Sequence, residues 1–311
     1  MTHLDPAIVD LARSQQGLVT TAQMTGLGIN PLVINGWSKS GLLSRQLRGA
    51  YAVPQLLEES TGPDATERAH LLKCRAALLL YKDGVLGSTS AVLAHGVAVW
   101  GADLSTPIIR RPIDRGRGIR GLHVRRCTSE PVDTAYGKVV PLTTALIEHA
   151  TDSGIVQGVV SADSAIHSQK ATAEELQAAV GKLSTRWSSR PKAMMSLVDG
   201  RSESPGESRL RCLLAFEGWE LIPQVDVRDE TGHVFARLDG VIAGMKIGIE
   251  FDGKLKYADG DAHVLIAEKR REDRLRALGW VIVRVEWADL ENPARLFAKI
   301  RRAMSLAQPA A

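Results

Sequence analysis

The chain has 311 residues, of which 44% are hydrophobic and 24% charged, and it carries a formal net charge of +4. These values exclude a disordered chain and predict a soluble globular protein of two or three domains, at about 100–200 residues for each domain. No run of about 18 apolar residues is present, so we expect no transmembrane helix and no membrane partner.

Three cysteines, Cys74, Cys127 and Cys212, lie far apart in the sequence and form no CxxC pair. This pattern excludes a disulfide framework and a structural zinc site, and it fits a reducing compartment. The N-terminus carries acidic residues and lacks the apolar core of a signal peptide. We therefore expect a cytoplasmic protein, and we expect no nucleotide cofactor.

Residues 1–54 predict three short helices followed by a β-hairpin. Asp5-Pro6 and Asn30-Pro31 are each a helix N-cap followed by proline at the first helical position. A turn at Arg48-Gly49 separates two short apolar segments. This order predicts a winged helix-turn-helix, whose second paired helix enters the major groove of DNA. A small helical domain for protein contacts is the alternative.

The third helix and the wing contain the residues that we expect to contact DNA. They are Asn35, Ser38, Lys39, Arg45 and Arg48. Residues 17–20 (GLVT) and 49–53 (GAYAV) resemble the N-terminal domain of the AbiEi antitoxin family. The resemblance covers roughly the first sixth of the chain and implies a DNA-binding regulator.

A polar segment, residues 55–66, predicts a linker to a mixed α/β middle domain at residues 67–183. Its first helix is amphipathic, with apolar residues at helical spacing up to residue 83. The segment from Ser88 to Gly96 resembles the middle part of AbiEi-like proteins.

The most basic block of the middle domain lies between residues 107 and 127. Arginine suits phosphate contacts because its guanidinium is planar and always charged. The candidate contacts in this block are Arg110, Arg111, Arg115 and Arg117. A Gly/Arg-rich hairpin here could follow a nucleic-acid backbone, and a solvated loop without a partner is an equal alternative.

Residues 200–307 predict a third domain, in the order helix, three strands, helix, strand, helix. The segment IGIEFDGKLK, residues 247–256, alternates apolar and charged side chains as a β-strand does. Glu250, Asp252 and Lys254 would share one face, and a hairpin would bring Asp239 to the same place. Carboxylates are costly in a core, so they favour a site for a hard cation. A solvated sheet face is the alternative.

This element order resembles the restriction-endonuclease-like PD-(D/E)XK superfamily, and within it the relatives of very-short-patch-repair endonuclease. The matching residues are Pro223-Gln224, Asp239, Glu250 to Gly253, Arg271, Asp273 and Gly279 to Arg284. The resemblance implies a mixed sheet flanked by helices and metal-assisted hydrolysis of phosphodiester bonds, with Mg²⁺ or Mn²⁺.

The resemblance also implies roles for single residues. Asp239 and Glu250 would hold the metal, and Asp252 stands where the superfamily usually has lysine. Lys254 could replace that lysine, or Asp252 could be a third metal ligand.

Glu207 and Gln224 would complete the catalytic site, although Ser204 and Glu207 also form the pattern of a capping box. The next helix has three arginines that would contact phosphates or form a solvated face: Arg270, Arg271 and Arg274.

Together the regions predict a multidomain protein of the α+β or α/β class. Its leading function is a DNA-binding protein with a Mg²⁺-dependent endonuclease domain. The alternative is a non-enzymatic AbiEi-type antitoxin or repressor with a degenerate nuclease-like domain, and a third possibility is a protein-interaction adaptor. DNA is the expected partner, and a cognate toxin or a second copy of the chain could join it.

Overall fold

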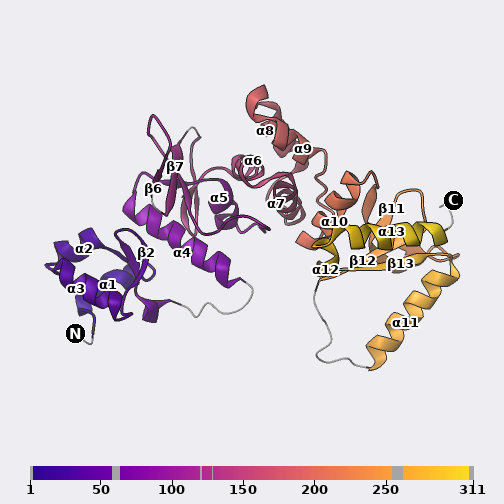
Figure 1. Cartoon of the computed structure of the whole chain (residues 1–311), viewed down its shortest axis with the longest axis horizontal. Coiled ribbons are helices and arrows are strands. Elements are labelled where there is room, and N and C mark those ends of the chain that lie inside the picture. Colours follow the sequence, from indigo (N-terminus) through magenta and orange to yellow (C-terminus); the bar gives the residue numbers. More distant parts are fainter. Residues whose placement is uncertain (1–2, 58–63, 120, 128, 254–261, 308–311) are drawn as a thin grey trace. The chain divides into compact units, whose positions relative to one another are not determined.

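The computed structural model describes residues 3–57, 64–119, 121–127, 129–253 and 262–307 (Figure 1). The chain divides into two compact units, Met1–Gly154 and Ile155–Ala311. Both units combine helices and sheets, as the sequence predicts. None of the described helices is long and apolar enough to cross a membrane.

The first unit begins with the secondary-structure order of a winged helix-turn-helix. Its elements are α1 (Pro6–Ser14), β1 (Leu18–Thr20), α2 (Thr21–Gly26), α3 (Pro31–Lys39), β2 (Ser44–Leu47) and β3 (Ala50–Ala52). The side chains of Asp5 and Asn30 cap α1 and α3, as predicted. The strands pair in the order β1-β3-β2, and β1 was not expected from the sequence.

Helix α4 (Ala65–Leu80) packs against this small sheet and also against a second sheet of six strands. The strand order of the second sheet is β6-β7-β5-β4-β9-β8. Its strands are β4 (Val85–Leu86), β5 (Ile108–Arg111), β6 (Arg117–Ile119), β7 (Leu122–Arg126), β8 (Val132–Thr134) and β9 (Gly137–Val139). Two helices, α5 (Ser88–Ala94) and α6 (Leu142–Ser153), pack against each other and complete the unit.

Hydrogen bonds fix the start of α5, which is buried along its whole length. The N–H of Ser88 donates to Glu148, and the hydroxyl of Thr89 bonds to the ring of His149. The hydroxyl of Ser90 bonds to the ring of His70 on α4. These bonds satisfy polar groups that would otherwise be costly to bury.

The second unit begins with α7 (Ile155–His167), α8 (Ala173–Gly181) and α9 (Ser189–Met195). The boundary between the units therefore falls inside the segment 67–183, which the sequence suggests as one domain. Asp163 of α7 links this helical part to α10 (Pro205–Phe216). Its buried carboxylate accepts hydrogen bonds from Ser208 and from the N–H of Asp199, and it forms an ion pair with Arg211.

A four-stranded sheet follows, in the order β10-β11-β12-β13. Its strands are β10 (Leu221–Arg228), β11 (Val234–Ile242), β12 (Ile247–Asp252) and β13 (Val281–Glu286). The first three strands are antiparallel, and β12 and β13 are parallel, with α11 (Ala262–Ala277) between them in sequence.

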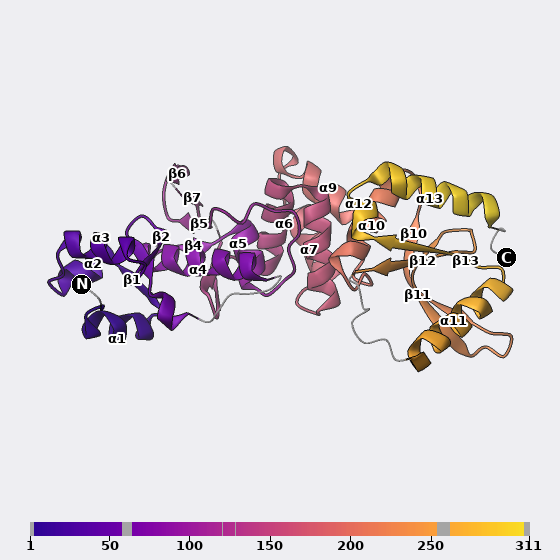
Figure 2. The ribbon, with the colours of Figure 1, turned by 60° about the horizontal axis from the view of Figure 1, so that its bottom comes forward.

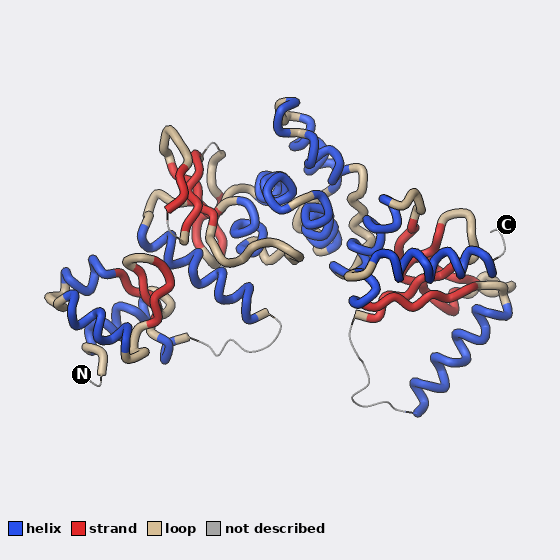
Figure 3. The backbone as a smooth tube through the Cα atoms, in the orientation of Figure 1, coloured by secondary structure: helices blue, strands red, loops and turns tan. Residues whose placement is uncertain are grey.

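Helices cover both faces of this sheet. Helix α13 (Pro293–Leu306) lies on one side and α11 on the other, as Figures 2 and 3 show. Leu210, Ile249 and Ile300 belong to the core on the α13 side, which also includes Leu290 of α12 (Trp287–Leu290). Leu275 of α11 packs on the other face. This is the mixed sheet flanked by helices that the sequence predicts.

Candidate functional site

Helix α3 buries one face and exposes the other. Ile34 and Trp37 are only 2% and 4% exposed and belong to the core of the winged helix. Asn35 and Lys39 therefore lie on the exposed face, where the sequence places them, whereas Ser38 is partly buried beside the core.

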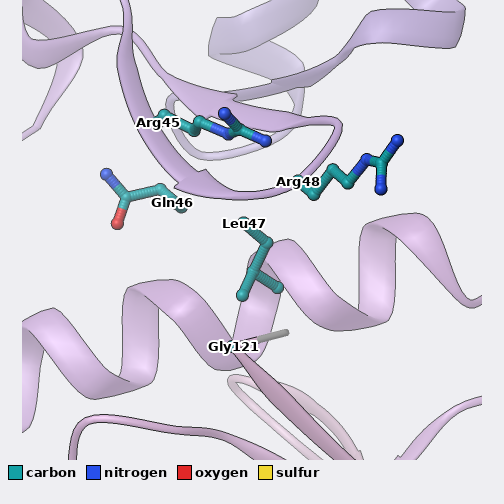
Figure 4. A pocket seen from close by; sticks show the side chains of 5 residues that line it. All are labelled: Arg45, Gln46, Leu47, Arg48 and Gly121. Atoms are coloured by element: carbon teal, nitrogen blue, oxygen red, sulfur yellow. The ribbon is translucent and has the colours of Figure 1, made fainter. Parts of the chain in front are cut away.

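The β2–β3 hairpin carries two exposed arginines, Arg45 and Arg48. Gly49 follows them with a left-handed φ of +90°, which the tight turn requires. Leu47 anchors the hairpin: it is buried and points toward the turn that carries Gly121, while Arg48 extends away from it (Figure 4). A shallow pocket of about 420 Å³ between the two hairpins is lined by both arginines. The wing is thus fixed in place with its guanidiniums free to meet solvent.

A row of polar side chains crosses the sheet of the second unit. Gln224 of β10 and Asp239 of β11 lie between two register pairs, Pro223 with Gly240 and Val225 with Leu238. The pairing of β11 with β12 ends at Gly240 and Ile249, the neighbours of Asp239 and Glu250, and β13 places Arg284 opposite Glu250. Gln224 has a left-handed φ of +54°, which is unusual for a residue with a side chain. Residues with such a backbone cluster at active sites and ligand clamps, although Gln16, Ser88 and Gln169 share this φ elsewhere in the chain.

Glu207 joins this row from the first turn of α10. The amide of Gln224 donates a hydrogen bond of 2.9 Å to the Glu207 carboxylate. Helix α10 can approach β12 because Gly206 has no Cβ. A Cβ at this position would overlap the ring of Phe251. The N–H of Glu207 also donates to Ser204, as in a capping box. Its carboxylate also accepts from the N–H of Glu203 and the hydroxyl of Ser204, so Glu207 closes the start of α10. Its catalytic role stays a prediction.

The acidic residues of the row affect one another. Burial raises the pKa of Asp239, and the nearby charges of Glu207, Glu250 and Glu203 raise it further. The N–H of Phe251 donates to Asp239 at 2.7 Å and opposes this rise. Asp239 thus lies where negative charge is crowded and partly removed from water.

Two arginines neutralise Glu250. Arg271 of α11 lies 2.6 Å from one carboxylate oxygen, and Arg284 lies 3.7 Å from the other. Arg271 also pairs with Glu268, and these two acids raise the pKa of its guanidinium. A cation that bound the Glu250 oxygen held by Arg271 would have to displace this guanidinium.

Comparison with known families bears on the first of these two sites. Residues 6–54 match the model of a family described as "Transcriptional regulator, AbiEi antitoxin". Residues 6–54 are thus similar to the regulator domain of that family. The resemblance predicted for the N-terminal segment is confirmed, and the match does not extend to the rest of the chain. No curated protein was found to match the chain.

Outside the AbiEi-type domain, several arginines expected to contact nucleic acid are held by internal acids. Arg110 donates from its Nε to Glu148 at 3.1 Å. Arg111 pairs with Asp83 at 2.8 Å, and Arg274 pairs with Asp229 at 2.6 Å. By contrast, Arg115 and Arg270 are exposed. Arg117 lies in β6, and its side chain is outside the described part of the chain.

The structure does not bring the three expected metal ligands into one group. Asp252 is exposed at the end of β12, two residues beyond Glu250. Lys254 lies outside the described residues. Within the described ranges, no three His, Cys, Asp or Glu side chains come close enough to hold a metal ion. A metal at Asp239, Glu250 and Asp252 therefore stays a prediction.

Arg284 is among the residues that carry the nuclease resemblance, but the sequence predicted no role for it in the site. Its alternation with Ile282 and Glu286 predicts only that it faces away from the apolar side of β13. The parallel pairing of β12 with β13 puts it opposite Glu250. No local pattern specifies that pairing, because the two strands are separated by α11.

Proposed function

We propose that the protein is a DNA-binding transcriptional regulator of the AbiEi antitoxin type. The observation that supports this most strongly is the exposed face of α3 together with the two exposed arginines of the wing. In helix-turn-helix proteins the second helix contacts base edges, while flanking basic side chains hold the backbone. Asn35 would contact bases, and Lys39, Arg45 and Arg48 would neutralise phosphates.

A salt titration tests this proposal. Each neutralised phosphate releases counterions and adds about 0.9 to the slope of log K against log salt concentration. Wild type and the triple variant Lys39→Ala, Arg45→Ala, Arg48→Ala would be compared on a duplex selected from a random library. We expect the variant to bind roughly a hundredfold more weakly, with a slope that is shallower by about 2 to 3.

The control is Arg13→Ala, which removes an exposed arginine from α1 that pairs with Asp10. We expect it to leave both affinity and slope unchanged. A triple variant that binds as tightly as wild type would refute the proposal. The description of the matched family also makes a cognate toxin a candidate partner, and a second copy of the chain remains another.

A second candidate function, metal-dependent DNA cleavage, rests on the polar row of the second unit. Carboxylate oxygens are the ligands that hard divalent cations prefer, and crowded acids are what such a cation stabilises. Asp239 and Glu250, with Glu207 beside them, would hold Mg²⁺ or Mn²⁺. The ion would polarise a phosphate oxygen and lower the pKa of an attacking water. Gln224 would position Glu207, and Arg271, released from Glu250, would face the phosphate.

Two measurements on Asp239→Asn and Arg271→Gln test this candidate. Calorimetry with Mn²⁺ should show binding by wild type, weaker binding by Asp239→Asn and tighter binding by Arg271→Gln, which lacks the competing cation. Cleavage of duplex, nicked and single-stranded DNA should be lost in Asp239→Asn. A wild-type protein that binds no Mn²⁺ and cuts none of these substrates would leave only the regulator.

A further inference from the structure

One apolar side chain stands out on the exposed face of α3. Leu32 is 79% exposed, more than any other large hydrophobic side chain in the described part of the chain. It lies on the second residue of the helix, opposite the buried Ile34 and Trp37. Removing the apolar surface of a leucine from water is favourable, so a partner that covers Leu32 would gain binding free energy.

A glycine lies one helical turn further along the same face. A Cβ at Gly36 would meet no atom within 4 Å, so no packing within the protein requires a glycine there. Glycine in the middle of a helix is nonetheless less favourable than alanine. Glycine is useful where another molecule must approach the backbone closely. Leu32 and Gly36 thus form a small apolar surface with room for a close neighbour.

The surroundings of this surface indicate an anionic partner. Asn35 and Lys39 flank it on the exposed face of α3. No acidic residue occurs between Leu11 and Leu57, whereas this segment includes Lys39 and the two wing arginines. A typical protein partner would not require a surface that carries positive charge and no negative charge. DNA favours such a surface, because its phosphates are negative.

We propose that Leu32 and Gly36 read the C5-methyl group of a thymine in the major groove, next to an adenine read by Asn35. The thymine methyl is the apolar feature of the major groove, and asparagine pairs with adenine through two hydrogen bonds. Leu32 contacts the methyl group, and the missing side chain at Gly36 lets the base edge come close to the helix. This inference rests on the proposed DNA-binding function.

Replacing thymine by deoxyuridine tests the inference, because it removes the methyl group and keeps the base pair. Each thymine of the selected duplex is replaced in turn, and binding is measured by fluorescence anisotropy. We expect wild type to lose roughly fourfold in affinity at one position, the value of one buried methyl-sized group. Leu32→Ala should bind the thymine duplex more weakly and bind the two duplexes equally well.

Two further variants separate a base contact from a general effect. Leu27→Ala removes another exposed leucine, just after α2, and should keep the preference for thymine. Gly36→Ala should raise the thermal stability of the domain while it weakens DNA binding, because alanine favours the helix but fills the space for the base.

Several outcomes would overturn the inference. Salt-sensitive binding by wild type with no response to any thymine replacement refutes the methyl contact but leaves the regulator. A preference for thymine that survives in Leu32→Ala also refutes it. A wild-type protein that binds no duplex DNA refutes the proposed function and this inference together.

Discussion

The two wing arginines and three arginines of the second unit are the same residue type in opposite situations. Arg45 and Arg48 are exposed, and among the described residues neither forms an ion pair. Arg271, Arg274 and Arg284 each lie within 4 Å of a carboxylate. A guanidinium already held by an acid must lose that partner before it can bind a phosphate. The local balance of acids and bases, more than the number of arginines, therefore indicates where DNA would bind.

The six-stranded sheet of the first unit resembles the second unit in this respect. Arg110, Arg111 and Arg125 pair with Glu148, Asp83 and Asp152. Three arginines of the basic block are thus engaged in internal ion pairs. Removing such a pair should affect stability, whereas removing an exposed arginine of the wing should affect DNA binding.

The largest effect is expected at the buried ion pair of the second unit. Asp163→Ala leaves the guanidinium of Arg211 buried without its carboxylate, and we expect a loss of about 3–5 kcal/mol in the free energy of unfolding. Urea unfolding followed by tryptophan fluorescence measures it. The double variant Asp163→Ala, Arg211→Met should recover part of the loss, because no buried charge then remains.

Asp226→Ala is the matched control in the same unit. Its pair with Arg228 is 4.0 Å long and exposed to solvent. Exposed pairs contribute little, so the loss should stay below about 1 kcal/mol. Equal losses in Asp163→Ala and Asp226→Ala would show that burial does not distinguish the two pairs.

The next effect contrasts two arginines of the first unit. The Arg110 side chain is 14% exposed and pairs with Glu148, so Arg110→Ala should lower the free energy of unfolding by about 2 kcal/mol. DNA affinity should not change at a temperature where the variant is folded. Arg48→Ala should instead leave stability within about 0.5 kcal/mol and make the salt slope shallower by about 1.

Parallel urea and anisotropy titrations of both variants check this contrast. If Arg110→Ala weakened DNA binding as much as Arg48→Ala does, the basic block of the middle sheet would belong to the interface after all. The expectation of a phosphate contact at Arg110 would then replace its assignment as an internal partner.

Local signals in the sequence predicted where α1 and α3 begin, but not strand β1. Each cap at Asp5 and Asn30 depends on side chains within three residues, so the pattern and the fold agree there. The polar row could be predicted only in part. Asp239 and Glu250 could be placed near each other because one hairpin joins their strands. The sequence did not indicate the left-handed backbone of Gln224 or the arginine partners of Glu250. Both depend on pairing between distant segments, which no local pattern specifies.

The smallest effect concerns His70, a buried group that is uncharged rather than ion-paired. Its Nδ1 lies 2.8 Å from the carbonyl of Leu104, which can only accept, so Nδ1 carries the proton. Its Nε2 then accepts from the hydroxyl of Ser90 at 2.9 Å, and the ring is neutral. Burial lowers the pKa of His70, and the charge of nearby Lys73 lowers it too, against the Leu104 carbonyl and Asp103.

The sign of the pH dependence follows from this lowered pKa. His70 of the unfolded chain has the ordinary histidine pKa of 6.5. As the pH falls, it therefore takes up a proton at a higher pH than His70 of the folded chain does. The contribution of His70 to the free energy of unfolding is therefore complete above about pH 6.5. It is lost as the pH falls from there through the lower pKa of the folded state. Urea unfolding from pH 7.5 to 5.5 should show this loss in wild type, smaller than that of Arg110→Ala, and should not show it in His70→Gln. The exposed His123 is the control, because His123→Gln should keep the wild-type slope. A slope that persists in His70→Gln would mean that another group in the chain takes up the proton.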